Sequence, residues 1–316
     1  MDRSPVIRSV ITGIPGWQDR PVEIEAAIPV LASPSWRGVD GAPLVARDPQ
    51  TGARLFVKHL HPDTAFYIAP EHAFAAARIA GEAGVGPRVL ASDARAGVLV
   101  TEYLGEGWRT AGLEHADDPG FVDRVLDARA RLAAGAPLPG RADVFADLRR
   151  FHALIEETGA PVAPDLGYAY DTVMLASERA GAGPPVPIHG DGNLSNVMFN
   201  AQGDIRLVDF DRAGMGTACA ELGSALVEMY AFDPLARAAF SRASAAFGLP
   251  DEDAVFDRVR LCGIADDLRW TMIGMLMGHL SPRRNEEFYK FGLWRLVRLR
   301  AALRDPRFGE RLRVGA

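Results

Sequence analysis

The chain has 316 residues, of which 48% are hydrophobic, and it carries a formal net charge of −6. Its length exceeds what one small hydrophobic core normally holds, so two packed units are expected. The acidic balance argues against nonspecific binding of nucleic acid, because such binding requires a basic surface that displaces counterions.

The N-terminal residues do not predict export or membrane insertion. They lack the basic-then-apolar pattern of a signal peptide, and no apolar run approaches the length of a membrane span. Cys219 and Cys262 form no metal-binding spacing, so we expect both to be reduced core residues. These features favour a cytoplasmic protein without membrane association, and they leave the oligomeric state open.

The first predicted unit spans residues 1–104 and alternates short strands with turns. Residues 54–58 read Arg-Leu-Phe-Val-Lys, which predicts a strand that ends in Lys58. Apolar residues then recur near helical spacing up to a Gly-Val-Gly-Pro turn at residues 84–87. This pattern predicts a helix with Glu71 in its first turn.

Residues 97–101 are β-branched and apolar, which predicts a buried strand. Three residues follow this strand at the end of the unit: Glu102, Tyr103 and Leu104. An earlier loop, residues 31–41, contains Ser33, Ser35 and glycines whose backbone amides could approach a phosphate. Glycines in a surface loop are usually turn formers, so both interpretations of this loop stay open.

The second predicted unit, residues 105–316, is mostly helical, because apolar residues recur there at helical intervals. The expected helices cover residues 126–132, 145–155, 170–180, 219–232, 234–247, 251–280 and 286–303. The two units together predict an α+β fold with a small mixed β-rich part and a larger, mainly helical part.

A short region of strands interrupts the helices of the second unit. Val197 to Phe199 and Ile205 to Val208 are apolar runs separated by turn-forming residues, which predicts a β-hairpin. Such a hairpin brings Asn196 and Asp209, which flank it, side by side.

Asp191, Asn196 and Asp209 have the chemistry of a phosphoryl-transfer site. Magnesium prefers oxygen ligands, and the amide of Asn196 with the carboxylate of Asp209 meets that need. Asp191 lies on the loop before the hairpin and is then free to accept a hydroxyl proton. Each residue alone would be interpreted as a turn residue, but the three together at this spacing favour a catalytic site.

This segment resembles the catalytic core of the kinase-like small-molecule phosphotransferases, the superfamily that contains aminoglycoside phosphotransferases and choline and ethanolamine kinases. In that superfamily the first loop reads H-G-D-x-x-x-x-N, which His189, Asp191 and Asn196 match, and a later magnesium-binding Asp matches Asp209. The resemblance is nearest to the bacterial choline-kinase-like branch. It implies a bilobal protein-kinase-like fold with a nucleotide-binding N-lobe, residues 1–104, and a C-lobe that holds the catalytic loop and the acceptor-binding helices, residues 105–316.

The resemblance also implies ATP and Mg²⁺ as cofactors. Lys58, held by Glu71, would orient the phosphates, and the segment after the buried strand would bind the adenine edge. The implied nucleotide-binding residues are Lys58, Glu71, Glu102, Tyr103, Leu104, Ser33 and Ser35. Asn196 and Asp209 would hold magnesium, Asp191 would accept the proton, and His189 would support the loop through a hydrogen bond.

Candidates for the acceptor site lie just after Asp209 and in the later helices, where the choline-kinase-like branch carries tryptophans and acids. The candidates are Asp211, Arg212, Asp267, Trp270 and Tyr289. An aromatic box with an acid would bind a quaternary ammonium group, but this chain has Ile273 where a second tryptophan would fall, and Glu221 where the branch has Asp. Buried aromatic residues are also common in helix packing, so a core role stays open.

We therefore expect an ATP-dependent kinase that phosphorylates a hydroxyl of a small molecule. Two alternatives remain: an aminoglycoside-type antibiotic phosphotransferase, and a nucleotide-binding protein of the same fold without catalysis. The first would require an acidic acceptor cleft, to which Asp211, Glu221, Glu228, Asp266 and Asp267 could contribute.

Overall fold

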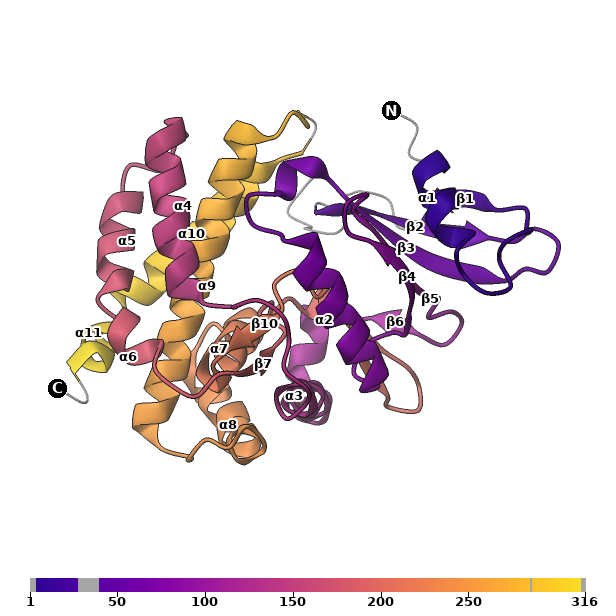
Figure 1. The fold of residues 1–316 in the computed structure, drawn as a ribbon. Helices are drawn as coiled ribbons and strands as arrows, with labels where there is room; N and C mark the ends of the chain where they lie inside the picture. The colour runs from indigo at the N-terminus through magenta and orange to yellow at the C-terminus, as the bar shows by residue number, and fades with distance from the viewer. Residues whose placement is uncertain (1–3, 28–39, 285, 314–316) are drawn as a thin grey trace.

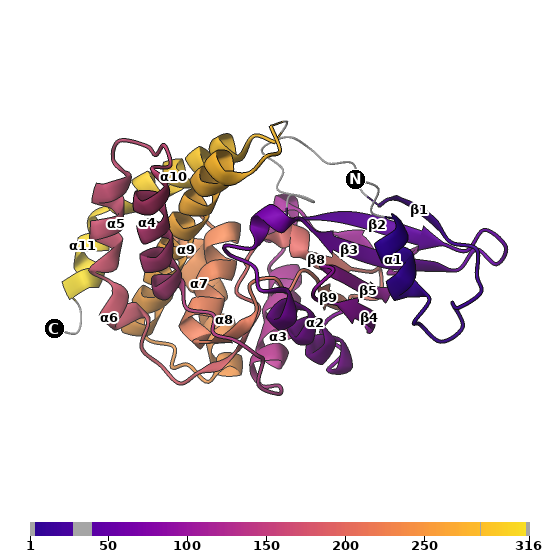
Figure 2. The ribbon, with the colours of Figure 1, turned by 45° about the horizontal axis from the view of Figure 1, so that its top comes forward.

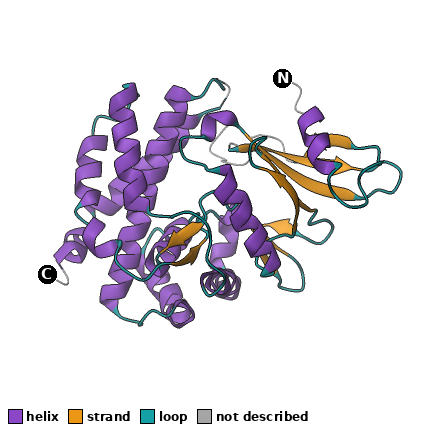
Figure 3. Cartoon of the chain, viewed as in Figure 1, coloured by secondary structure: helices purple, strands orange, loops and turns teal. Residues whose placement is uncertain are grey.

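The computed structural model describes residues 4–27, 40–284 and 286–313. It consists of an N-terminal part built on a twisted sheet and a larger C-terminal part built mainly of helices (Figures 1 and 3). The two parts meet along helix α2 (Pro70–Glu82) and strands β8 (Val197–Phe199) and β9 (Ile205–Leu207), which are labelled between them in Figure 2.

The N-terminal sheet has five antiparallel strands in the order β1-β2-β3-β5-β4. Their bounds are β1 Glu23–Ala26, β2 Gly41–Arg47, β3 Arg54–Leu60, β4 Val89–Asp93 and β5 Val98–Glu102. Strand β3 alternates as predicted: Leu55 and Val57 are buried in a small core beneath helix α1 (Ser4–Ile11), which the sequence did not predict. The opposite face of β3 therefore presents Phe56 and Lys58 to the C-terminal part.

The predicted catalytic hairpin is present. Strand β8 pairs with β9, and β6 (Arg109–Thr110) extends this small sheet from the other side of β8. A second pair, β7 (Val186–Ile188) with β10 (Gly214–Gly216), brackets the hairpin in the sequence. Two connections therefore run between the two small sheets: the loop from β7 to β8 and the turn from β9 to β10.

The remaining helices form the C-terminal part around α9. Their bounds are α3 Pro119–Ala133, α4 Val144–Thr158, α5 Leu166–Met174, α6 Ser177–Ala180, α7 Ala218–Met229, α8 Asp233–Ala243, α9 Asp253–Leu280, α10 Phe288–Arg304 and α11 Pro306–Arg313. Helix α9 packs against α4, α7 and α10 and is buried on nearly all sides. The single helix expected over residues 170–180 is instead divided between α5 and α6. No helix in the described ranges is long and apolar enough to cross a membrane.

Candidate active site

Asp191 lies at the centre of the loop between β7 and β8, and local hydrogen bonds fix its side chain. Its carboxylate accepts from the backbone N–H of Asn193 at 2.9 Å and from Nδ2 of Asn196 at 3.0 Å. The amide oxygen of Asn193 in turn caps the next turn by accepting from the N–H of Ser195. Asp191 is only 8% exposed, so its carboxylate has a defined orientation within the protein.

The hairpin joins Asn196 to Asp209 as predicted, because the N–H of Val208 donates to the carbonyl of Asn196 at 2.9 Å. Nε2 of the buried His189 donates to the carbonyl of Val208, also at 2.9 Å. Asp209 then adopts a left-handed backbone (φ 67°), the only positive φ of a non-glycine residue in the described ranges. The hydrogen bonds on either side of Val208 hold this costly conformation, as is common where a side chain is aimed into an active site.

His189 is buried beside the loop, and its Nε2 is bound to the backbone. Its ring is fully buried and packs at 4.8 Å from the ring of Phe210. Burial, together with the nearby charge of Arg129, lowers the pKa of His189. A neutral imidazole that donates to Val208 is consistent with the supporting role expected for His189.

Lys58 reaches from β3 across the cleft to the turn after the hairpin. Its Nζ lies 2.6 Å from Oδ1 of Asp209 and 2.5 Å from Oδ2 of Asp211. Burial alone would lower the pKa of Lys58, but the carboxylates of Asp209, Asp211 and Asp40 outweigh it and raise the pKa. Burial would likewise raise the pKa of Asp209, yet the charge of Lys58 lowers it. Lys58 and Asp209 are thus both held in their charged forms.

The expected pair between Lys58 and Glu71 is not formed. Glu71 lies in the first turn of α2, as predicted, but its side chain is exposed. Asp209 and Asp211 take its place, because the turn after β9 brings two carboxylates directly to Nζ of Lys58.

Asp40, Asp209 and Asp211 form an acidic cluster beside Lys58. One carboxylate oxygen from each of the three residues lies within 4.8 Å of the other two. Burial, with the charge of Asp209, raises the pKa of Asp211 to about 8 and that of Asp40 to about 6, and the hydroxyl of Tyr67 donates a hydrogen bond to Asp40. The donor set is entirely oxygen, which suits a hard cation such as Mg²⁺. Of these carboxylates, only Asp209 was predicted as a magnesium ligand.

These groups share one cleft of about 370 Å³ between the two parts of the molecule. Asp191, Asn196, Asp209 and Lys58 line one end together with Asp40 and Asp211, and the segment predicted for adenine lines the same cleft. That segment comprises Glu102, Tyr103 and Leu104. Apolar side chains complete the wall: Phe56, Leu99, Met198, Val208 and Phe210. The cleft therefore combines an apolar region with a concentration of charged groups.

Two of the acceptor candidates, Arg212 and Asp267, are buried and do not line the cleft. Arg212 donates to the carbonyl of Tyr67 at 2.5 Å and pairs with Asp147, so its charge is neutralised inside the protein. Asp267 is 1% exposed, and both of its oxygens accept from Nε of Arg298. Neither residue is among those that line the cleft, so a contact with an acceptor stays a prediction for both.

The aromatic candidates are also packing residues. Trp270 is 2% exposed and meets the ring of Phe291 edge to face at 6.0 Å, and neither lines the cleft. Tyr289 is half-buried against Gly278, where an added Cβ would lie 2.4 Å from the tyrosine ring. Of the expected acceptor residues, Asp211 alone is among the residues that line the cleft. Ser33 and Ser35 lie outside the described residues.

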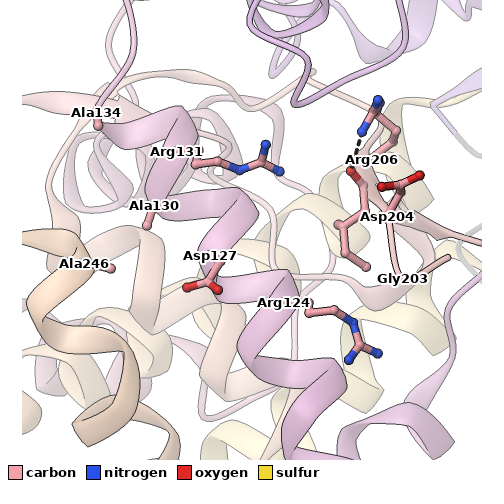
Figure 4. Close-up of a pocket in the computed structure, with 10 residues that line it drawn as sticks. Arg124, Asp127, Ala130, Arg131, Ala134, Gly203, Asp204, Arg206 and Ala246 are labelled. Atoms are coloured by element: carbon pink, nitrogen blue, oxygen red, sulfur yellow. Dashed lines mark hydrogen bonds between the residues drawn. The ribbon is translucent and has the colours of Figure 1, made fainter.

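A second and larger cavity of about 580 Å³ shares none of these residues. It is open to solvent and lies between α3 and the turn of the hairpin, where Arg124, Asp127 and Arg131 on α3 face Asp204 and Arg206 (Figure 4). The loop that carries Asp191, the acidic cluster and Lys58 lie in the smaller cleft and not in this cavity.

The sequence assigns the protein to a known family. The model of the phosphotransferase enzyme family matches residues 38–260, more than half of the chain, so the chain belongs to that family. A search of curated proteins found no match.

Solved structures show the same fold. A choline/ethanolamine kinase family protein from Mesorhizobium loti is 24% identical, with 98% of each chain covered and a TM-score of 0.73. The choline kinase LicA from Streptococcus pneumoniae is 17% identical, with 95% of this chain and 98% of that chain covered and a TM-score of 0.74. A putative aminoglycoside phosphotransferase from Ralstonia eutropha is 13% identical, with 98% of each chain covered and a TM-score of 0.55. The protein therefore has a bilobal kinase-like fold, as predicted.

Proposed function

We propose that this phosphotransferase transfers the γ-phosphoryl group of ATP to a hydroxyl of a small molecule. The observation that carries the proposal is the convergence of Lys58, Asp191, Asn196 and Asp209 in one cleft. These residues come from β3, the β7–β8 loop and the turn after β9, and each has the side chain that phosphoryl transfer requires.

Each residue has a role in this reaction. Lys58 binds the nucleotide phosphates through its ammonium group, and the segment from Glu102 to Leu104 receives the adenine. Asp191, fixed by Asn193 and Asn196, accepts the proton of the attacking hydroxyl. An oxygen donor set that includes Asn196 and Asp209 would hold Mg²⁺, which when bound neutralises charge on the phosphates.

The acidic cluster adds a feature to this proposal. Asp40 and Asp211 provide two carboxylates beyond the pair expected for magnesium, and both reach the cleft. Of the five acids considered for a polycationic antibiotic, four are engaged elsewhere: Glu221, Glu228, Asp266 and Asp267 pair with buried arginines. Among the described residues, the pairing of these four acids leaves Asp211 as the member of the set that reaches the cleft, which favours a smaller alcohol or amino alcohol over a polycation.

A release assay for ADP tests the proposal. The protein is incubated with ATP and Mg²⁺ and a panel of alcohols, amino alcohols, sugars and amino sugars, and products are analysed by mass spectrometry and ³¹P NMR. We expect one acceptor class to stimulate ADP release and to gain one phosphoryl group. If ATP binds with Mg²⁺ but neither ADP release nor a phosphorylated product is detected with any acceptor, the chain is a nucleotide-binding protein and the proposal fails.

A further inference from the structure

Buried charged side chains hold the backbone of the catalytic loop at Gly190 and Asp191. The N–H of Gly190 donates to Oε2 of Glu221 at 3.0 Å, and its carbonyl accepts from Nη2 of Arg269 at 2.7 Å. The carbonyl of Asp191 accepts from Nη2 of Arg129, also at 2.7 Å. These backbone groups are consequently satisfied by charged side chains and not by secondary structure.

Arg129 and Glu221 act as one unit in this arrangement. Nη1 of Arg129 lies 2.7 Å from Oε1 of Glu221, so each side chain binds the other with one atom and the loop with its second atom. Arg129 lies on α3 and Glu221 in the first turn of α7, so the pair joins two helices that are far apart in the sequence. Both side chains are almost completely buried, at 1% and 0% exposure.

Stability alone does not explain this pair. Removing two charges from water costs several kcal/mol per ion, and buried ion pairs can often be replaced by apolar residues without loss of stability. Apolar replacements, however, could not bind the carbonyl of Asp191 or the N–H of Gly190. The property that distinguishes the pair from apolar residues is therefore its hydrogen bonding to the backbone of the loop.

The hydrogen bond from Arg129 to the carbonyl of Asp191 complements the hydrogen bonds on the Asp191 side chain. Asn193 and Asn196 fix the carboxylate, but both belong to the same loop and would move with it. Arg129 fixes the backbone of the same residue to a helix of the C-terminal part. The position of the carboxylate relative to the cleft is thus set from outside the loop by the guanidinium group.

We propose that Arg129, oriented by Glu221, is a positioning residue that sets the reactive geometry of Asp191 through its backbone carbonyl. The proposal rests on the proposed function, because it assumes that Asp191 is the group that accepts the proton.

A double-mutant cycle tests the proposal through the reaction rate. Arg129→Met is made in the natural chain and in an Asp191→Asn background, and ADP release is measured with the acceptor from the screen or, in its absence, as slow ATP hydrolysis. We expect kcat to fall at least about tenfold in the natural chain, with little change in the dissociation constant of ATP. In the Asp191→Asn background the further fall should be less than about twofold, because the group that Arg129 positions is already inactive. An equal fall in both backgrounds would overturn the proposal.

Two further variants separate positioning from general stability. Arg129→Lys retains the charge but lacks the planar fork, so we expect an intermediate kcat. Arg260 is a matched control, because it is also buried, pairs with Asp233 at 3.0 Å and donates to the carbonyl of Tyr230, away from the loop. Arg260→Met should lower the melting temperature and leave kcat unchanged. A fall in kcat as large as that of Arg129→Met would contradict the proposal.

A measurement without turnover completes the test. Hydrogen–deuterium exchange of the full chain should accelerate in the peptide that covers residues 188–193 in Arg129→Met but not in Arg260→Met, because only the former frees the loop. If Arg129→Met does not fold, Glu221→Gln is used, which keeps the length of the side chain and removes its charge. Unchanged exchange in the folded variant would refute the proposal, whereas inactivity of the natural chain would refute only the proposed function.

Discussion

The catalytic loop packs directly against helix α7 at Gly192, which makes this residue a sharp probe of the site. A Cβ at Gly192 would lie 1.8 Å from the carbonyl oxygen of Ser224 and 2.3 Å from its carbon. Both are backbone atoms within a helix, so they cannot rotate away as a flexible side chain can. Gly192→Ala must therefore displace the loop or the helix.

The cost follows from this geometry. Overpacking of a core typically costs about 1–3 kcal/mol, and a clash between two backbones should reach at least the upper value, about 3 kcal/mol. Because the displacement begins one residue after Asp191, a shift of about 1 Å should also lower kcat about a hundredfold. Stability and activity should thus fall together.

Urea unfolding followed by circular dichroism, with ADP release on the same samples, measures both effects. Gly167→Ala is the matched control, because Gly167 lies on α5 and an added Cβ there meets no atom within 4 Å. This control should be neutral or up to about 1 kcal/mol more stable, with unchanged activity. Natural stability and turnover in Gly192→Ala would refute the described packing of the loop on α7.

Two other predictions concern the acidic cluster. Lys58→Met should weaken ATP binding and, without nucleotide, should enlarge the increase in melting temperature caused by Mg²⁺, because Lys58 no longer competes for Asp209 and Asp211; an equal Mg²⁺ effect in both proteins would contradict this. Burial raises the pKa of Asp211 from 3.8 to about 8, so the folded protein favours the protonated form of this side chain. The stability that this protonated form contributes is present at low pH and is lost as the pH rises toward 8. Asp211→Asn has no carboxyl group to titrate and lacks this loss. In metal-free urea titrations, its free energy of unfolding minus that of the natural chain should therefore increase between about pH 5 and pH 8. A constant or decreasing difference would contradict this prediction.

The sequence predicted the features that depend on residues close to one another in the chain. The hairpin depends on two apolar runs and the turn between them, and its two ends place Asn196 and Asp209 together without reference to the rest of the chain. The strand ending near Lys58 and the helix after Pro70 are likewise local patterns, and both are present. For the same reason, the bonds within the catalytic loop follow from residues only a few positions apart.

The errors concern contacts between distant parts of the chain. The pairing of Lys58 with Asp209 and Asp211 depends on how β3 is oriented toward the hairpin. The position of Glu71 in the sequence gives no information about that orientation. Helix α9 is buried almost all round, so its periodicity does not show whether Trp270 faces the cleft or the core.

Some residues of the site were missed, although the sequence carried a signal for one of them. Arg129 lies four residues after Val125 and seven after Val122, on the buried stripe of α3. A charged residue on an apolar stripe is expected to have a buried partner. That partner, Glu221, is 92 residues away, so only the fold identifies it.

The most direct test of the proposed reaction compares Asp191→Asn with Asp204→Asn. Asp204 is an exposed residue in the turn of the same hairpin, so its variant controls for the loss of one carboxylate. With the acceptor from the screen, Asp191→Asn should lose about 10²- to 10⁴-fold in kcat, while it still binds ATP and unfolds cooperatively, and Asp204→Asn should match the natural chain. Full turnover in a folded Asp191→Asn variant would contradict the assignment of Asp191 as the group that accepts the hydroxyl proton.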